Sequence, residues 1–102
     1  MIYADADLER AVAASTGAIF FKQGESCTAG SRHFVERAVY DEVVGGIVEQ
    51  AGRMRIGPGT DPETDLGPLV SQEQLDRVMA YIDSGRRDGA RLVAGGTRVG
   101  ER

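Results

Sequence analysis

The single cysteine of the chain lies in the stretch QGESCTAGSR, residues 23–32. A cysteine sulfur is intrinsically strongly nucleophilic and forms covalent intermediates. Two glycines bracket it, which is typical of a turn, and backbone N–H groups there, together with the nearby Arg32, favour the reactive thiolate. The nearby carboxylate of Glu25 has the opposite effect and disfavours the thiolate. Free cysteines are also often buried as small apolar residues, so residue physics leaves Cys27 open between a nucleophile and a structural thiol.

Other reactive side chains fit ordinary structural roles. His33 is the only histidine and is a candidate base for the thiol, but six residues of apparently extended chain separate the two. A strand or surface histidine is the simpler interpretation. Two sets of alternating acids fit helix capping or turns better than metal ligation: Asp5, Asp7 and Glu9, and Asp61, Glu63 and Asp65. We therefore predict no metal site.

Three segments have the apolar spacing of helices. The first is residues 7–23, with Asp5 or Asp7 as its cap and Gly24 as its stop. The second carries one apolar stripe through residues 40–54. The third begins at Ser71, because SQEQ fits a capping box in which Gln74 reaches back to the cap, and it ends at Asp88-Gly89.

Two short segments, HFVER at 33–37 and ARLVA at 90–94, are predicted as strands. Strands separated by helices favour an α/β layer with parallel strands. Between the second and third helices, residues 55–70 hold all three prolines and form a long loop. Two strands make a poor independent sheet, so the pattern indicates part of a larger domain.

The composition excludes several classes of protein. With 102 residues the chain is one domain at most, and 41% of its residues are hydrophobic but only 6% aromatic. A net charge of −4 gives no reason to expect nucleic acid or an anionic membrane as partner. We expect no signal peptide and no membrane span. One cysteine cannot form an internal disulfide framework, which favours the cytoplasm.

Several blocks occur together and in one order: ADADLERAV, FFKQGESCTAGSR, YDEVV, GPGTDPETDLGPLVS, YIDSG and GARLVAGG. In this combination the chain resembles the aldehyde dehydrogenase superfamily over nearly its whole length. The pairing of the cysteine block with the downstream TDLGPL segment is specific. The resemblance implies an α/β fold, namely part of the catalytic domain with three helices and two short parallel strands.

By this resemblance Cys27 is the nucleophile of an NAD- or NADP-dependent aldehyde oxidation. It attacks the aldehyde to form a thiohemiacetal, hydride passes to the cofactor, and water hydrolyses the thioester. The backbone N–H of Cys27 helps to hold the oxyanion. The family's substrate-pocket positions fall on Phe21, Ser26 and Thr28. Its cofactor-ribose positions fall on Gln74 and Arg77, whose simpler roles are helix capping and a solvated charge.

The chain departs from the family pattern at two positions, where Lys22 replaces an asparagine and Glu25 replaces a small or polar residue. The family's cofactor-binding domain, its catalytic glutamate and its oxyanion-hole asparagine have no counterpart here. Residues 1–102 are therefore expected to be one segment of the catalytic domain, about a fifth of a complete enzyme, without turnover by itself. Its expected partners are the aldehyde and either a homo-oligomer or the remainder of the parent enzyme.

Two other hypotheses stay open. One is a non-catalytic remnant or interaction module that associates with itself through exposed apolar helix faces. The other makes Cys27 a redox sensor, which requires an accessible and activated thiol.

Overall fold

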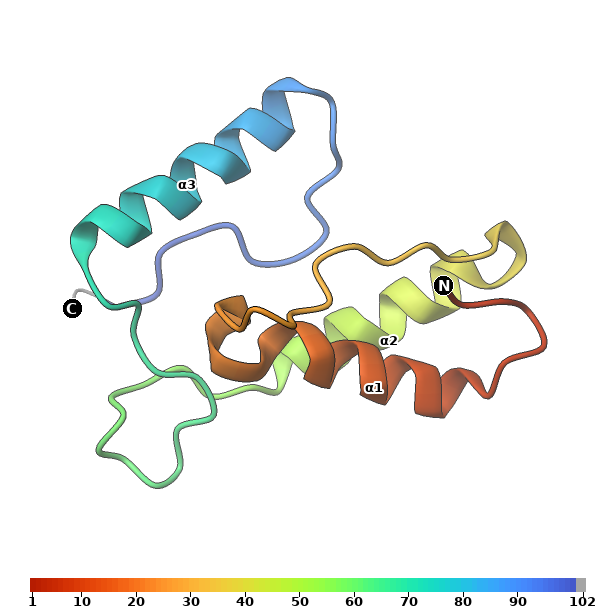
Figure 1. Cartoon of the computed structure of the whole chain (residues 1–102), viewed down its shortest axis with the longest axis horizontal. Coiled ribbons are helices and arrows are strands. Elements are labelled where there is room, and N and C mark those ends of the chain that lie inside the picture. Colours follow the sequence, from red (N-terminus) through yellow and green to blue (C-terminus); the bar gives the residue numbers. More distant parts are fainter. Residues whose placement is uncertain (101–102) are drawn as a thin grey trace. The chain divides into compact units, whose positions relative to one another are not determined.

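The computed structural model describes residues 1–100 and divides the chain into two compact units, Met1–Gly67 and a second unit that begins at Pro68. The described residues form three α-helices and two short 3-10 helices. In chain order these are α1 (Leu8–Phe20), η1 (Phe21–Gly24), η2 (Arg37–Val39), α2 (Tyr40–Gly52) and α3 (Gln72–Arg87). The first four belong to the first unit, where α1 and α2 lie side by side (Figure 1).

The core of the first unit lies between α1 and α2. Val43 of α2 is completely buried and Val12 of α1 is 7% exposed. Val12 packs against Gly46, since a Cβ at position 46 would lie 2.9 Å from Cγ1 of Val12. Thr16 is buried beside them and satisfies its hydroxyl by donating to the carbonyl of Val12 at 2.9 Å. The glycine in α2 thus allows the two helix backbones to approach closely.

Helix α1 begins where the sequence predicts and ends three residues early. Of the two candidate caps, Asp7 takes the role, because its Oδ1 accepts from the backbone N–H of Arg10 at 3.1 Å. The α-helix ends at Phe20, not at residue 23, because the backbone of Lys22 and Gln23 turns left-handed, with φ of 50° and 57°. Gly24 continues this turn with φ of 75°.

Helix α2 follows a turn of 3-10 helix and starts at Tyr40, as the apolar stripe predicts. Asp41 and Glu42 lie in its first turn, where carboxylates interact favourably with the helix dipole. It ends at Gly52, two residues before the predicted end, and its last carbonyls are capped by the backbone N–H of Arg53.

The two predicted strands do not form as strands. Within residues 1–100, strand pairing is limited to two isolated parallel bridges, Ile2–Val35 and Ile56–Leu66. The segment 33–37 therefore pairs in parallel, but only at Val35, where Ile2 donates to Phe34 at 2.8 Å and accepts from Glu36 at 2.9 Å. Residues 90–94 form no strand. A strand needs a neighbour to pair with, and the described chain offers this segment none.

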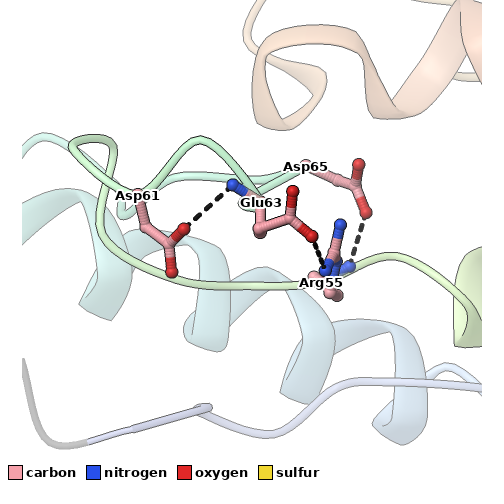
Figure 2. Close-up of polar contacts among 4 residues, drawn as sticks. All are labelled: Arg55, Asp61, Glu63 and Asp65. Carbon is pink, nitrogen blue, oxygen red and sulfur yellow. Dashed lines mark hydrogen bonds and ion pairs between the residues drawn. The ribbon is translucent and has the colours of Figure 1, made fainter.

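The loop that follows α2 is closed at its neck by backbone hydrogen bonds. The carbonyl of Arg55 accepts from the N–H groups of Asp65 and Leu66 at 2.8 and 3.0 Å. In return, Oδ2 of Asp65 accepts from the Arg55 N–H at 2.8 Å, and the Arg55 guanidinium pairs with Glu63 at 2.6 Å (Figure 2). The carboxylate of Asp61 accepts from the Glu63 N–H at 2.9 Å. Residues 55–66 thus form a compact Ω-loop, with its acids in turn roles.

The second unit is built on α3. Ser71 caps it, since its Oγ accepts from the Gln74 N–H at 3.2 Å, and the helix runs from Gln72 to Arg87, within a residue of the prediction. At the C-terminal end of the helix, the backbone N–H of Ala90 donates to the carbonyl of Gly85 at 2.9 Å. The apolar stripe predicted for this helix is half-buried, at Leu75, Val78, Met79 and Ile82. None of the helices in residues 1–100 combines the length and apolarity needed to cross a bilayer.

Candidate active site

Cys27 lies on an exposed turn after η1. The N–H of Ala29 donates to the carbonyl of Ser26 at 3.0 Å, so Cys27 and Thr28 occupy the two corner positions of a four-residue turn. The thiol is free and the residue is exposed. A structural thiol would be expected in the core, and Cys27 lies outside the core of the first unit.

The two residues that flank the cysteine are joined through their side chains. The hydroxyl oxygens of Ser26 and Thr28 lie 3.0 Å apart, within hydrogen-bonding distance. The N–H of Thr28 also points at Ser26 Oγ, at a long 3.4 Å. Both residues were predicted to line the substrate pocket, and they belong to the same turn as Cys27.

The entry to this turn has an unusual backbone. Lys22 and Gln23 are non-glycine residues in the left-handed region, a conformation that costs a residue with a Cβ about 1–2 kcal/mol. The N–H of Glu25 donates to the Lys22 carbonyl at 2.9 Å and holds the turn closed. Phe21, the third predicted substrate residue, is 63% exposed at the start of η1, and Lys22 Nζ lies 5.7 Å from its ring centroid.

The exit from the turn is fastened at Gly30. Its N–H donates to the carbonyl of Ala18, on the last turn of α1, at 3.0 Å. Its carbonyl lies 2.6 Å from Nε2 of His33. A side chain at position 30 would crowd the helix, since a Cβ there would lie 3.1 Å from the Cβ of Ala18. Sequence reasoning missed this role of His33, because the residue was assigned to the predicted strand 33–37 and not to a turn back to Gly30.

The two predicted cofactor residues lie on α3, in the second unit. The backbone N–H of Gln74 donates to Oγ of the Ser71 cap at 3.2 Å. The guanidinium of Arg77 is 64% exposed and lies 3.5 Å from Glu73, one turn away. The predicted nucleophile and the three predicted substrate residues, by contrast, belong to the first unit: Cys27, Phe21, Ser26 and Thr28. The structure therefore brings Ser26, Cys27 and Thr28 together in one turn and holds Gln74 and Arg77 one turn apart on another element.

The family model described as the aldehyde dehydrogenase family matches residues 1–102. The chain belongs to the aldehyde dehydrogenase family.

Solved structures agree with this assignment. HpcC from Thermus thermophilus is 49% identical over 96% of this chain, with a TM-score of 0.93. Aldehyde dehydrogenase from Bacillus cereus, in a complex with NAD⁺, is 44% identical over 98% of the chain, with a TM-score of 0.93. Betaine aldehyde dehydrogenase from Staphylococcus aureus, also with NAD⁺, is 31% identical over 98% of the chain, again with a TM-score of 0.93.

The chain spans about a fifth of the length of these proteins, 19% of the first, 21% of the second and 20% of the third. The chain thus matches one segment of a known fold. Of the two short parallel strands expected at 33–37 and 90–94, only the first takes part in a parallel bridge, at Val35.

Proposed function

We propose that this chain supplies the nucleophilic segment of an NAD- or NADP-dependent aldehyde dehydrogenase, with Cys27 as the attacking residue. The observation that carries the proposal is the exposed, free thiol on the Ser26–Ala29 turn, in a chain of the aldehyde dehydrogenase family. NAD⁺ is bound in the relatives from Bacillus cereus and Staphylococcus aureus, which supports a nicotinamide cofactor for the complete enzyme.

In the proposed reaction the Cys27 thiolate attacks the carbonyl carbon of an aldehyde. A carbon–sulfur bond forms, the carbonyl oxygen becomes an oxyanion, and the backbone N–H of Cys27 donates to it. The carbonyl then re-forms as hydride leaves the same carbon, giving a thioester. Water cleaves the thioester, releasing the carboxylic acid and the thiol. The aldehyde is oxidised by two electrons, and the nicotinamide cofactor, when bound, takes up the hydride.

The neighbouring residues have proposed positioning roles. Phe21 offers an exposed aromatic face to the apolar part of an aldehyde, and the linked hydroxyls of Ser26 and Thr28 belong to the residues on either side of Cys27. The amide of Gln74 and the guanidinium of Arg77 supply N–H donors suited to ribose hydroxyls, and the exposed position of Arg77 leaves its weak pair with Glu73 free to exchange.

The proposal is tested by acylating Cys27 with an activated ester, p-nitrophenyl acetate, in the 102-residue chain. The expected result is nitrophenolate release several times faster than from a free thiol model, with the acyl group on Cys27 by mass spectrometry. Cys27→Ala should abolish it. A rate no higher than that of glutathione would contradict a nucleophilic role. We expect no aldehyde-dependent NADH or NADPH formation by the isolated chain, so detecting it would refute the fragment interpretation.

The non-catalytic alternative draws on the large apolar side chains at the surface. Phe34 is 56% exposed in the first unit, and Tyr81 is 75% exposed in the second. This alternative requires such side chains to form a contiguous apolar patch, which would favour association. Sedimentation velocity at rising concentration separates the two functions. A chain that stays a monomer and acylates Cys27 supports the nucleophile, whereas an oligomer with an unreactive thiol supports the interaction module.

A further inference from the structure

His33 is tied to the segment that carries Cys27. Its Nε2 lies 2.6 Å from the carbonyl oxygen of Gly30, three residues after the cysteine. A carbonyl oxygen can only accept, so Nε2 carries the proton and donates it. With Nε2 committed as donor, His33 does not offer this nitrogen as a base for the thiol. The contact is therefore structural, directed at the backbone of the cysteine loop.

Gly30 is the point at which the loop returns to the helix. Its N–H donates to Ala18 of α1 at 3.0 Å, while its carbonyl accepts from His33. A Cβ at this position would lie 3.1 Å from Ala18 Cβ and 3.4 Å from His33 Nε2. Both the helix and the imidazole thus lie close to Gly30, and a larger residue there would force one of them to shift.

The imidazole is itself held in place through the backbone that follows it. The carbonyl of Phe34 accepts from the Ile2 N–H at 2.8 Å, and Val35 forms the parallel bridge with Ile2. His33 is therefore adjacent to a tethered segment and reaches back from it to the loop. Two anchors result, α1 on one side and the Ile2–Val35 bridge on the other, with Gly30 between them.

We propose that His33 is a positioning residue for Cys27: by donating to the Gly30 carbonyl it holds the exit of the cysteine turn against α1. The turn spans Ser26 to Ala29, so its last residue precedes the fastened glycine directly. Fixing that end restricts the backbone on which the thiol is carried, and orientation of a nucleophile is a recognised contribution to rate. This inference rests on the proposed role of Cys27 as nucleophile.

Three variants test the contact. The side-chain nitrogen of glutamine reaches about as far as Nε2 of histidine, whereas that of asparagine is shorter and corresponds to Nδ1. His33→Gln should therefore keep the donor, and His33→Asn and His33→Leu should lose it. The first readout is hydrogen exchange of the Gly30 amide by NMR. Exchange should accelerate about fivefold in the Asn and Leu variants, as expected for losing one neutral hydrogen bond, and stay near wild type in the Gln variant.

The second readout is the rate of Cys27 acylation by p-nitrophenyl acetate. It should fall severalfold in His33→Asn and His33→Leu and return in His33→Gln, while exchange at the buried Val43 amide stays unchanged. Equal Gly30 exchange in wild type and His33→Leu, or a Gln variant that behaves like Leu, overturns the inference. If Gly30 exchange follows the predicted pattern but wild-type Cys27 acylates no faster than glutathione, the proposed function fails and the His33–Gly30 contact stands.

The imidazole of His33 in the wild-type protein provides a test that needs no variant. Imidazole ¹⁵N shifts report which nitrogen is protonated in the neutral ring, and the contact requires the Nε2–H form. Finding the Nδ1–H tautomer would contradict the assignment even if the variants failed to fold.

Discussion

Val12 of α1 and Gly46 of α2 are in direct contact, and a Cβ built at position 46 would lie 2.9 and 3.0 Å from the two methyl groups of Val12. Gly45, the preceding residue, has nothing within 4 Å of its own Cβ position. Two adjacent helical glycines therefore have opposite environments, one closing a helix interface and the other open.

This contrast predicts opposite effects of one substitution. Gly45→Ala should stabilise the protein by about 0.5–1 kcal/mol, because alanine has the higher helix propensity. Gly46→Ala gains the same propensity but forces Val12 to move, at a cost of about 1–3 kcal/mol. Urea denaturation measures the difference in unfolding free energy between the two variants. The gain in helix propensity is common to both and cancels in this difference. Equal stability of the two would contradict the close helix packing.

The left-handed backbone before the cysteine predicts that Lys22→Asn is stabilising. Lys22 has φ of 50° and ψ of 48°, a region that asparagine tolerates better than lysine. Lys22→Gln is the matched control, because it also removes the cation over the Phe21 ring without improving backbone tolerance. We expect the Asn variant to be more stable than the Gln variant by about 0.5–1 kcal/mol, since each left-handed residue costs about 1–2 kcal/mol. A Gln variant equal to Asn in denaturant unfolding would exclude backbone strain as the cause.

The two carboxylates that contact Arg55 should differ in importance. Asp65 accepts from the backbone N–H of Arg55, whereas Glu63 forms an ion pair in which both side chains are more than half exposed. Exposed pairs contribute about 0–1 kcal/mol. Asp65→Ala should therefore speed exchange of the Leu66 amide about tenfold, and Glu63→Ala by about twofold at most, by hydrogen-exchange NMR. Salt should diminish only the Glu63 effect. The reverse order would show that the guanidinium, not the backbone, closes the loop.

Ser71 is predicted to stabilise α3 through its cap. Ser71→Ala removes the acceptor for the Gln74 N–H and should cost about 1 kcal/mol, visible as lost helicity in circular dichroism. Ser84→Ala is the control, because Ser84 lies inside the helix, where alanine is the better helix former. Its helicity should be unchanged or slightly higher. Equal losses at both positions would mean that the hydroxyl of Ser71 makes no special contribution.

Helix starts were the most predictable part of this fold. The caps Asp7 and Ser71 act through local hydrogen bonds three residues ahead. Spacing predicted Ser71 directly and narrowed the first cap to Asp5 or Asp7. The apolar stripe of α2 likewise predicted its start at Tyr40. For the two caps the determining interactions lie within one turn of helix, so the sequence contains them in full.

The predictions were wrong where the local structure depends on distant residues or on a rare backbone conformation. HFVER and ARLVA have strand-like composition, but strands depend on neighbours, and only Val35 finds one, at Ile2. The left-handed pair Lys22–Gln23 was missed because non-glycine residues seldom take positive φ. The proposed role of Cys27 came from resemblance, and its turn was predicted from the two flanking glycines. The exposure of Cys27 and the His33 contact needed coordinates.

Because hydrogen bonds close the neck of the Ω-loop, the geometry of the neck does not depend on the number of residues at the tip. Arg55 and Leu66 are paired through the backbone, and the residues near the tip, Pro58 to Asp61, are exposed. Additional residues at the tip would lengthen only an already closed loop, and doubling a loop costs only about 0.6 kcal/mol in closure entropy. Residues added at the tip should therefore leave the paired neck of this chain unchanged, which makes the tip a natural place to insert a peptide tag.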